Sequence, residues 1–452
     1  MPVALDQVFK AYDVRGVYPD QLDEELAERV GRAFVALTGA GTLAIGQDMR
    51  PSSKPMADAL AAGAMAQGAD VLRVGLCSTD MLYYVSGALD VAGVMLTASH
   101  NPARYNGLKL CRAGAVPVGE ESGLADIKRM VAAGEPAGDA PRRGQERQAD
   151  DLLERYAAHV RSFADLGSLR PLKVVADAGN GMAGHVVPAI FGGLPFQLVS
   201  MYFELDGSFP NHPADPLNPE NLRQLQARVV AEGADVGLAF DGDADRVFLV
   251  DERGATVPSS LVGALVARLM CEREPGATVL YNLICSRVVP ETIREAGGVP
   301  VRTRVGHSFI KGVMAETGAI FGCEHSGHYY FRDNYRADSG LIAALVALDA
   351  LSRAGRPLSE VLAPYRRYAA SGEINRRVDG DPGTVIEEVA GRYPAGAADF
   401  LDGLTVEGGD WWFNLRPSNT EPLLRLNVEA ATEADMARVR DEVLEAVGGE
   451  PA

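Results

Sequence analysis

The sequence predicts an α/β protein of several domains with mixed sheets, followed by a smaller α+β domain at the C-terminal end. Its 452 residues are enough for two to four domains of ordinary size. Over most of the chain, apolar runs of strand length alternate with segments of helical periodicity, a pattern typical of α/β domains. From residue 411 onward the order changes to strand, polar loop, strand and helix, which indicates a separate unit.

The first half of the chain shows the alternation clearly. One face of a helix is marked by apolar side chains at helical spacing, namely Leu22, Leu26, Val30, Phe34 and Leu37. Strands are predicted over 43–46, 71–75 and 91–96, a helix over 56–66, and a strand, a glycine loop and a helix starting at 172–181.

In the second half, two strand-like runs flank an acidic loop at residues 241–246. A helix is predicted from Ser259 to Met270. After the C-terminal pair of strands, Thr432 is predicted to be the N-cap of a final helix, because Asp435 follows it three residues later.

The charge of the chain narrows the classes of partner. A formal net charge of −18 repels nucleic acid and anionic membranes, so we expect neither as a partner. An anionic small molecule remains a possible ligand only where cations gather in one cleft.

The chain is predicted to work in the cytoplasm. Asp6 and Lys10 precede any apolar run, which is unlike a signal peptide, and no run reaches the roughly 20 apolar residues that span a bilayer. The cysteines show neither CxxC pairing nor disulfide-rich density. Buried free thiols are therefore predicted at Cys77, Cys111, Cys271, Cys285 and Cys323.

Polar, turn-forming clusters follow many of the apolar runs directly. The sequences of these loops are YDVRG, GQDMR, TASHNP, DAGNG, DGDAD, CEHSGH and RPSNT. Since α/β proteins build their sites on loops at strand ends, this number of loops indicates a composite site fed by several domains.

The loop DGDADR carries three alternating carboxylates, Asp241, Asp243 and Asp245, which can converge on a hard cation. A solvated acidic turn between two strands explains the same residues. An EF-hand calcium loop is disfavoured although Glu252 lies at its twelfth position, because Arg246 stands where the sharp turn needs glycine. We favour a catalytic magnesium bound together with a phosphate.

The loop TASHNP follows a strand and ends in proline, so Ser99 is expected to lie exposed on a turn. A serine there can be a nucleophile, but serine, histidine and asparagine are also ordinary turn residues. Lys109 can bind an anion, or it can simply be solvated.

Two further loops have the composition of ligand-binding sites. Glu324, Ser326 and His328 share one glycine-containing loop that could bind sugar hydroxyls or form an ordinary polar turn, while His307 and Lys311 lie four residues apart and share a face if helical.

Near the C-terminus, Arg416 stands beside small hydroxyl and amide residues, with Arg425 close by, a composition that can hold phosphate. Most of the histidines lie in the candidate loops rather than along helices, which favours acid–base or phosphate chemistry: these are His100, His212, His307, His325 and His328.

Taken in order, TASHNPARYNGLK, FDGDADR, GCEHSGH and RPSNTEP resemble the motifs of the α-D-phosphohexomutase superfamily. The similarity runs from FKAYDVRG at residue 9 to the C-terminal helix. VGHSFIK, EHSGHYYFRDNYRADSG and STDMLYY are similar to the bacterial phosphomannomutase/phosphoglucomutase branch.

This resemblance implies four domains around a central cleft, three related mixed α/β domains and a smaller C-terminal α+β domain. The implied domains are a phosphoserine-bearing domain over 1–150, a metal-loop domain over 151–255, a sugar-recognition domain over 256–367 and a phosphate-binding domain over 368–452.

The resemblance also implies a reaction. Phosphate moves reversibly between C1 and C6 of hexose phosphates, with mannose and also glucose expected as the sugar, through a phosphoserine at Ser99. Mg²⁺ is the implied cofactor, and a hexose 1,6-bisphosphate is the implied intermediate and activator. A monomer or dimer is expected.

Individual residues follow by motif match. The implied metal ligands are Ser99, through its phosphate, with Asp241, Asp243 and Asp245. The implied catalytic residues are Ser99, His100, Lys109, Arg246, His307 and His328. The implied substrate-binding residues are Tyr12, Arg15, Lys311, Glu324, Ser326, Arg416, Ser418, Asn419, Thr420 and Arg425.

Several positions depart from the family pattern, and they bear on sugar preference rather than on the reaction: Gln47, Asn282, Ile284 and Cys323. A phosphoglucosamine mutase is the near alternative, although a residue other than His325 is expected there. A metal-dependent phosphatase or a metal-binding protein without activity is the alternative from a different class.

Overall fold

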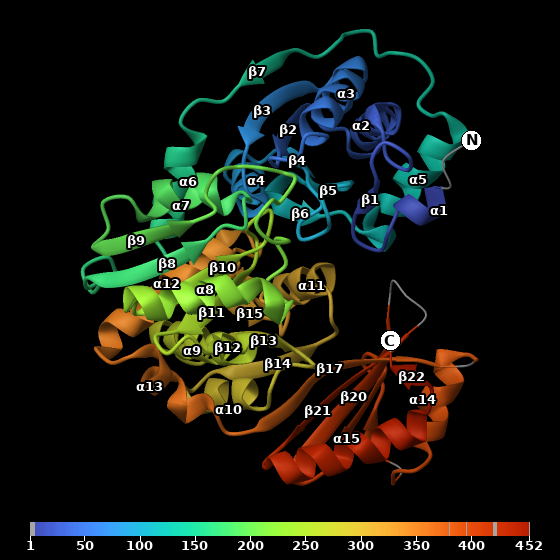
Figure 1. Cartoon of the computed structure of the whole chain (residues 1–452). Coiled ribbons are helices and arrows are strands. Elements are labelled where there is room, and N and C mark those ends of the chain that lie inside the picture. Colours follow the sequence, from blue (N-terminus) through green and yellow to red (C-terminus); the bar gives the residue numbers. More distant parts are fainter. Residues whose placement is uncertain (1–4, 379, 395, 419–422, 452) are drawn as a thin grey trace.

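The structure is a computed structural model that describes residues 5–378, 380–394, 396–418 and 423–451, without the side chains of residues 307 and 308. Within these residues the strands form four sheets, which follow one another along the chain (Figure 1). The first three sheets mix parallel and antiparallel pairs, and the last is antiparallel throughout. The predicted α/β organisation with a smaller α+β unit at the end is therefore confirmed.

The first sheet has the strand order β1-β5-β4-β2-β3-β7, with β6 paired to β5. Its central strands are buried because α3 and α4 both pack against β2. The strands are β1 (Val14–Val17), β2 (Thr42–Gln47), β3 (Asp70–Leu76), β4 (Ala92–Leu96), β5 (Tyr105–Arg112), β6 (Val116–Pro117) and β7 (Glu146–Gln148). The helices are α1 (Leu5–Val8), α2 (Glu24–Thr38), α3 (Ser53–Ala66), α4 (Thr79–Leu89) and α5 (Leu124–Ala133).

The second sheet has the order β12-β11-β10-β8-β9. Every residue of β10 and β11 is buried, and the turn between these two antiparallel strands carries the acidic loop. The strands are β8 (Leu172–Asp177), β9 (Phe196–Met201), β10 (Val236–Phe240), β11 (Val247–Asp251) and β12 (Thr256–Val257), and the helices are α6 (Leu152–Arg161), α7 (Ala183–Phe191) and α8 (Pro219–Glu232).

The third sheet has the order β14-β13-β15-β16, and the antiparallel turn from β15 to β16 carries Glu324, Ser326 and His328. The strands are β13 (Thr278–Asn282), β14 (Val299–Thr303), β15 (Phe321–Cys323) and β16 (Tyr329–Phe331). The helices are α9 (Ser259–Arg273), α10 (Val288–Glu295), α11 (His307–Thr317), α12 (Gly340–Ala354) and α13 (Leu358–Leu362).

The fourth sheet has the order β18-β19-β20-β21-β17-β22 and is covered by α14 and α15. As predicted, Thr432 caps the last helix by accepting a hydrogen bond from the Asp435 backbone N–H at 3.1 Å. The strands are β17 (Ala369–Arg377), β18 (Ala398–Asp399), β19 (Leu404–Glu407), β20 (Trp411–Pro417), β21 (Leu424–Ala430) and β22 (Glu450–Pro451), and the helices are α14 (Pro382–Ala390) and α15 (Glu433–Val447).

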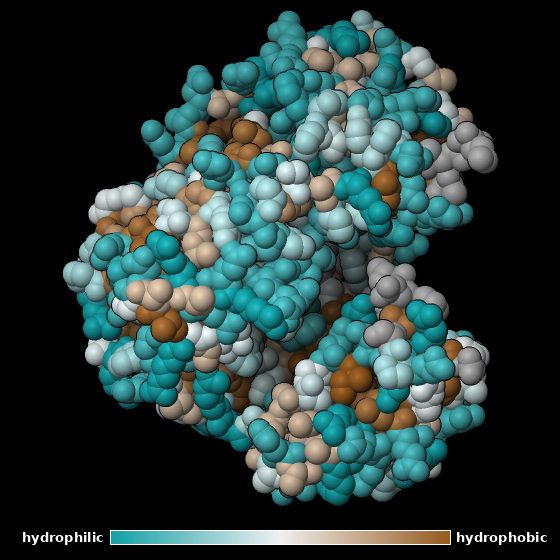
Figure 2. All heavy atoms as spheres, in the orientation of Figure 1, coloured by the Kyte–Doolittle hydropathy of each residue, from teal (hydrophilic) through white to brown (hydrophobic). Residues whose placement is uncertain are grey.

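The apolar core shows which of the four units share a continuous hydrophobic cluster. One continuous cluster joins α4 of the first unit to α6 and α7 of the second and to α9 and α12 of the third. The fourth unit packs its sheet and helices around a separate cluster. Figure 2 shows a deep hollow between that C-terminal unit, at the lower right, and the rest of the molecule. None of the helices in the described residues has the length and apolar character needed to cross a bilayer.

Candidate active site

Ser99 lies on the loop that follows β4, with a backbone φ of +48° in the left-handed region. Its backbone N–H donates to the Thr97 hydroxyl at 2.9 Å, and the Arg50 guanidinium donates to its carbonyl at 2.9 Å. The expectation of an exposed turn is wrong, because the residue is only 4% exposed. The reason is tertiary: the loop packs so closely on Gly242 that a Cβ there would lie 2.4 Å from the Ser99 carbonyl oxygen.

The Ser99 hydroxyl contacts groups from two loops. It donates to Asp241 Oδ2 at 2.6 Å, and it receives a hydrogen bond from Arg246 Nη2 at 3.2 Å. His100 Nδ1 lies 3.2 Å from the same oxygen and also contacts the Arg246 guanidinium. Burial, together with the charges of Arg246 and Arg15, holds the pKa of His100 well below its usual value. These four side chains therefore place the predicted phosphate carrier against an acid and a permanent cation.

The three aspartates of the acidic loop are all buried, so a solvated turn is excluded. Each offers a carboxylate oxygen within 4.8 Å of the others. Asp243 Oδ1 and Asp245 Oδ1 are buried and accept no hydrogen bond from the described residues. Orphaned carboxylate oxygens that converge in this way fit a hard divalent cation.

Two cations of the chain partly balance these charges. Lys109 Nζ lies 2.7 Å from Asp243 Oδ2 and 2.7 Å from Asp245 Oδ2, and Arg246 Nε lies 2.9 Å from Asp241 Oδ2. Burial raises the pKa of Asp241 to about 7 against the opposing charge of Arg246. Burial acts in the same direction on Asp243, but Lys109 outweighs it and lowers the pKa of that carboxyl. Burial by itself lowers the pKa of Lys109, but the charges of Asp243 and Asp245 raise this pKa well above its usual value overall.

The EF-hand alternative is excluded by the position of Glu252. Its carboxylate accepts hydrogen bonds from the backbone N–H and the hydroxyl of Ser359, at 3.1 and 2.5 Å. Glu252 is therefore bound to the α13 segment and does not join the aspartates.

Tyr12 and Arg15 reach the site from the N-terminal segment. Arg15 donates to Asn101 Oδ1 at 2.6 Å and to Asp13 Oδ2 at 2.5 Å, beside the Ser99 loop. Tyr12 packs edge-on against Phe309 of α11, with ring centroids 6.1 Å apart. Tyr12 thus connects the first unit to the third, whereas Arg15 binds within the first unit.

Glu324 is buried in the turn between β15 and β16, where its two carboxylate oxygens are already hydrogen-bonded. Tyr330 Oη donates to Oε1 at 2.5 Å, while Asn282 Nδ2 and the Gly306 N–H donate to Oε2 at 3.1 and 3.3 Å. Asn282, which departs from the family pattern, therefore helps to fix the position of the Glu324 carboxylate. Ser326 lies half-buried in the same turn.

His328 and Lys311 both bind Asp338. His328 Nδ1 lies 2.9 Å from Asp338 Oδ2, and Lys311 Nζ lies 2.8 Å from Asp338 Oδ1. Burial by itself lowers the pKa of His328, but the hydrogen bond to Asp338 and the charge of Asp245 raise it overall. Lys311, expected to touch substrate, is only 3% exposed.

The phosphate-type loop joins β20 to β21. Arg416 and Arg425 both pair with Glu373 of β17, at 2.9 and 3.4 Å. The Ser418 N–H donates to the Leu423 carbonyl at 2.8 Å. The predicted residues Asn419 and Thr420, and the side chain of His307, lie outside what the structure describes.

Sequence reasoning missed several partners of the predicted residues. The Thr79 hydroxyl donates a hydrogen bond to Asp243 Oδ2 at 2.5 Å, and Asn101 accepts one from Arg15. Asp338 binds both His328 and Lys311. Glu373 forms ion pairs with Arg416 and Arg425. Thr79 and Asp338 lie in motifs that carry the family resemblance, so their position was a usable signal. Glu373 lies in β17, outside all the motifs, so the sequence gave no signal for it.

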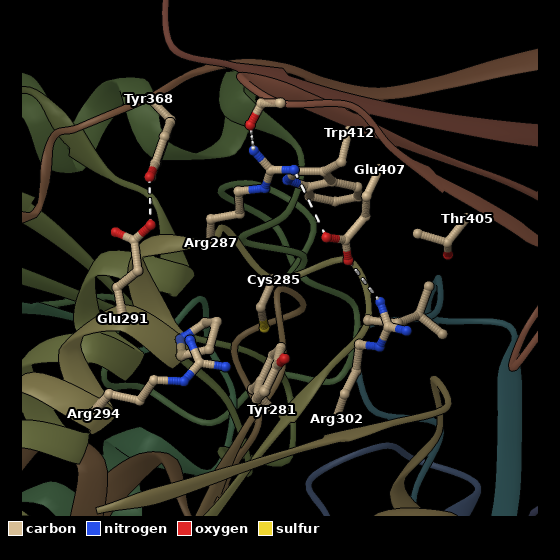
Figure 3. Close-up of a pocket in the computed structure, with 13 residues that line it drawn as sticks. Tyr281, Cys285, Arg287, Glu291, Arg294, Arg302, Tyr368, Thr405, Glu407 and Trp412 are labelled. Carbon is tan, nitrogen blue, oxygen red and sulfur yellow. Dashed lines mark hydrogen bonds and ion pairs between the residues drawn. The ribbon is translucent and has the colours of Figure 1, made fainter. Parts of the chain in front are cut away.

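A polar cavity of about 330 Å³ lies at the joint between the third and fourth units (Figure 3). Arg287 crosses this joint and donates to the carbonyls of Gly408, Gly409 and Trp411 at 3.0–3.1 Å. Arg302 crosses it to Glu407 at 3.2 Å. The cavity thus contains polar contacts that help to attach the C-terminal unit.

Comparisons with known proteins identify the family of the chain. Four family models match: phosphoglucomutase/phosphomannomutase α/β/α domains I, II and III at residues 6–137, 154–254 and 258–368, and the C-terminal domain at 373–446. A protein of Xanthomonas campestris pv. campestris described as "Phosphohexose mutases" is 41% identical over 96% of this chain and 97% of its own. A phosphomannomutase of Escherichia coli strain K12 is 38% identical over 96% and 97%.

A solved structure is similar over the whole length. The crystal structure of a phosphoglucomutase/phosphomannomutase family protein from Burkholderia thailandensis superposes with a TM-score of 0.88 at 32% identity, covering 98% of this chain and 99% of that one. With four matching domain models and near-complete relatives, the resemblance seen in the motifs is confirmed. The chain belongs to the phosphoglucomutase/phosphomannomutase family of hexose phosphate mutases, in its bacterial branch.

Proposed function

We propose that the protein interconverts mannose 1-phosphate and mannose 6-phosphate, and also the two glucose phosphates, with Ser99 as the phosphate carrier. The observation that carries this proposal is the contact of the Ser99 hydroxyl with Asp241 at 2.6 Å and with Arg246 at 3.2 Å. A serine held between a metal-type carboxylate and a guanidinium suits a phosphoryl group, whose charge both a metal and an arginine would neutralise.

The proposed cycle begins with phosphate on Ser99. A free hydroxyl of a hexose monophosphate attacks the phosphorus, the bond from phosphorus to Ser99 Oγ breaks, and a hexose 1,6-bisphosphate forms. The bisphosphate then turns over in the cleft, and its other phosphate passes back to Ser99 Oγ. Ser99 therefore carries phosphate again at the end of the cycle, and the bisphosphate is an intermediate. The bisphosphate also acts as an activator, because it can transfer a phosphate to an enzyme whose Ser99 has lost its own.

Each proton in this cycle needs a carrier. The attacking hydroxyl loses a proton to a base, and an acid returns one in the second transfer. Our candidates are Lys109, His307 and His328, with His100 and Arg246 as groups that contact the Ser99 oxygen. Lys109 stands between Asp243 and Asp245, so it can also neutralise charge beside the transferring phosphate.

Asp241, Asp243 and Asp245, with a phosphate oxygen on Ser99, would hold a Mg²⁺ ion. When bound, the ion supplies positive charge that offsets the charge on the phosphoryl oxygens. The orphaned oxygens of Asp243 and Asp245 support this assignment.

Recognition is proposed to divide between two loops. Glu324 and Ser326 would bind ring hydroxyls that mannose and glucose share, since the two sugars differ only at C2. The phosphate that is not reacting would bind Arg416, Ser418, Asn419, Thr420 and Arg425, and Tyr12 and Arg15 would complete the wall of the cleft.

Each part of the chain has one proposed role. The proposed units are a phosphoserine domain over 1–150, a metal-loop domain over 151–255, a sugar domain over 256–367 and a phosphate domain over 368–452. We propose that the protein works in the cytoplasm as a monomer or dimer. A phosphoglucosamine mutase is not favoured, because the near-complete relatives are phosphomannomutases and phosphohexose mutases.

Ser99→Ala tests the carrier. The purified wild-type protein should show a phosphate adduct by intact mass after incubation with glucose 1,6-bisphosphate, and the variant should show neither the adduct nor mutase turnover. Ser162→Ala is the matched control, since that exposed hydroxyl donates only to the His159 carbonyl of its own helix. Full mutase activity in Ser99→Ala would refute the mechanism.

Substrate choice needs a separate assay. Coupled measurements should give turnover with mannose 1-phosphate and glucose 1-phosphate, and much less with glucosamine 1-phosphate. Preferred turnover of the glucosamine compound would overturn the assignment of sugar.

A further inference from the structure

We propose that Asp338 is a positioning residue for the reaction: it fixes the orientation and tautomer of His328, and Lys311 in turn fixes Asp338. The inference rests on the function proposed above. It assigns a role to a buried carboxylate that acts through His328, and it gives Lys311 a task other than binding the sugar.

The hydrogen bond between His328 and Asp338 determines which ring nitrogen carries the proton. Nδ1 lies 2.9 Å from Asp338 Oδ2, and the next carboxylate, Asp245 Oδ1, lies 3.9 Å away. An ionised carboxylate only accepts hydrogen bonds, so Nδ1 must be the nitrogen that bears hydrogen in the neutral ring. Nε2, which makes no hydrogen bond to the residues that the structure describes, is then left as the nitrogen that can exchange a proton with substrate.

The backbone holds Asp338 in place. It pairs with Tyr330 of β16 in an isolated bridge, and the next residue, Ser339, caps α12 by accepting from the Ile342 N–H at 3.0 Å. Asp338 is only 3% exposed. The carboxylate therefore has a fixed position between a strand and a helix start, on the side of His328 opposite to its free nitrogen.

Lys311 orients this carboxylate. Its ammonium lies 2.8 Å from Asp338 Oδ1 and 4.0 Å from the centre of the Tyr83 ring, in a buried position on α11. The ammonium takes one carboxylate oxygen and leaves the other for His328. It also places a cation where a metal ion would otherwise compete, so the grouping of Asp245, His328 and Asp338 is better explained as a proton-holding chain than as a second metal site.

The ammonium makes one substitution especially informative. In Asp338→Asn, the amide has one acceptor and one donor group, and Lys311 can only donate. The Asn oxygen must then face Lys311, which turns the Asn NH₂ group toward His328 Nδ1. That nitrogen has to give up its hydrogen, so the neutral ring changes to the Nε2–H tautomer and presents the wrong nitrogen to substrate.

The experiment compares Asp338→Asn, Lys311→Met and the double variant in the mutase assay. We expect kcat of Asp338→Asn to fall by ~100-fold with KM within about threefold, since general acid–base catalysis contributes at least this much. The double variant should recover kcat by about tenfold over Asp338→Asn, because without the ammonium the amide can turn its oxygen to His328. A loss of packing alone would not be rescued by a second buried substitution.

Asp349→Asn is the matched control. Asp349 is another fully buried aspartate with a cationic partner, Arg353, at 2.7 Å, but it lies on α12 away from the loop residues. This variant should lose thermal stability and keep kcat.

A spectroscopic measurement on the wild-type protein is independent of any variant's folding. Long-range ¹H–¹⁵N correlation spectra of the neutral imidazole, assigned with His328→Gln, should show hydrogen on Nδ1 of His328. The proposal is overturned if that hydrogen is on Nε2, if Asp338→Asn keeps kcat, or if Lys311→Met fails to restore it. A wild-type protein without mutase turnover would instead refute the proposed function, so the two failures are distinguishable.

Discussion

At the residue scale, the position of Ser99 is fixed by contacts with residues that lie far from it in the chain. Its carbonyl is held by Arg50, and its hydroxyl by Asp241 and Arg246. A left-handed backbone is unfavourable for a serine, and it persists here because these contacts determine it. The strained turn points the hydroxyl at the acidic loop, where the proposed chemistry needs it.

Asp243→Asn tests the acidic loop. The substitution removes one charge from a site whose Oδ1 is unsatisfied and whose Oδ2 is held by Thr79 and Lys109. We expect turnover to fall at least tenfold at limiting Mg²⁺, and less at saturating Mg²⁺, because the affinity for a divalent cation depends on ligand charge. Asp251→Asn, at the far end of β11, is the control; its carboxylate accepts from Arg253 and Ala255 in its own turn. Equal Mg²⁺ dependence in the two variants would count against the metal assignment.

At the element scale, the first unit depends on the close approach of α2 and α3. A Cβ added at Gly31 would lie 2.3 Å from the Leu60 carbonyl oxygen, and one at Gly63 would lie 2.1 Å from that of Glu28. Because each glycine has no side chain, the backbone of the other helix can pack directly against it. Alanine would give the better helix propensity at both positions, so close packing decides the residue.

Gly31→Ala should therefore destabilise the protein. The added methyl group forces the helices apart, and overpacking of this kind costs about 1–3 kcal/mol of unfolding free energy. Thermal or denaturant unfolding followed by circular dichroism measures the change. Gly41→Ala is the control, since a Cβ at Gly41 meets no atom within 4 Å. A Gly31→Ala midpoint equal to that of the control would contradict the packing argument.

At the scale of the whole molecule, the C-terminal unit is attached through polar contacts and through a small apolar cluster in which Trp412 packs against Leu283 and Ile284 of the third unit. It has its own apolar core, whereas a continuous core runs through the other three units. Arg287 and Arg302 cross the joint at the cavity of Figure 3, and Arg302 also pairs with Asp399. Strand β20 connects the two sides of this unit, with Trp412 at the cavity and Arg416 at the phosphate-type loop. The position of the joint therefore sets the position of the phosphate-type loop.

Arg287→Met should loosen this attachment. The loss of three hydrogen bonds from a charged donor costs about 2 kcal/mol, enough to raise the population of a detached C-terminal unit by about 30-fold. KM for the hexose phosphate should rise, and limited proteolysis between the third and fourth units should become faster. Arg438→Met, which breaks only contacts along the outer face of α15, should change neither. Unchanged KM and proteolysis in Arg287→Met would show that the joint does not depend on this arginine.

Much of the fold and of the candidate site could be predicted from the sequence, because these features depend on local patterns. Apolar periodicity is enough to place α2, the β10–β11 hairpin and α9, and side-chain capping places the start of α15 at Thr432. The motifs also identified Asp241, Asp243 and Asp245 as one group, since they share a turn.

The tertiary structure decided what each of these groups contacts. The burial of Ser99, the pairing of Lys109 with two aspartates and the roles of Asp338 and Glu373 join residues that are tens to hundreds of positions apart. Local patterns fix the elements because a residue's neighbours in sequence are its neighbours in a helix or strand. Burial, charge balance and tautomer depend on which loops meet, and that is settled only when the sheets pack together.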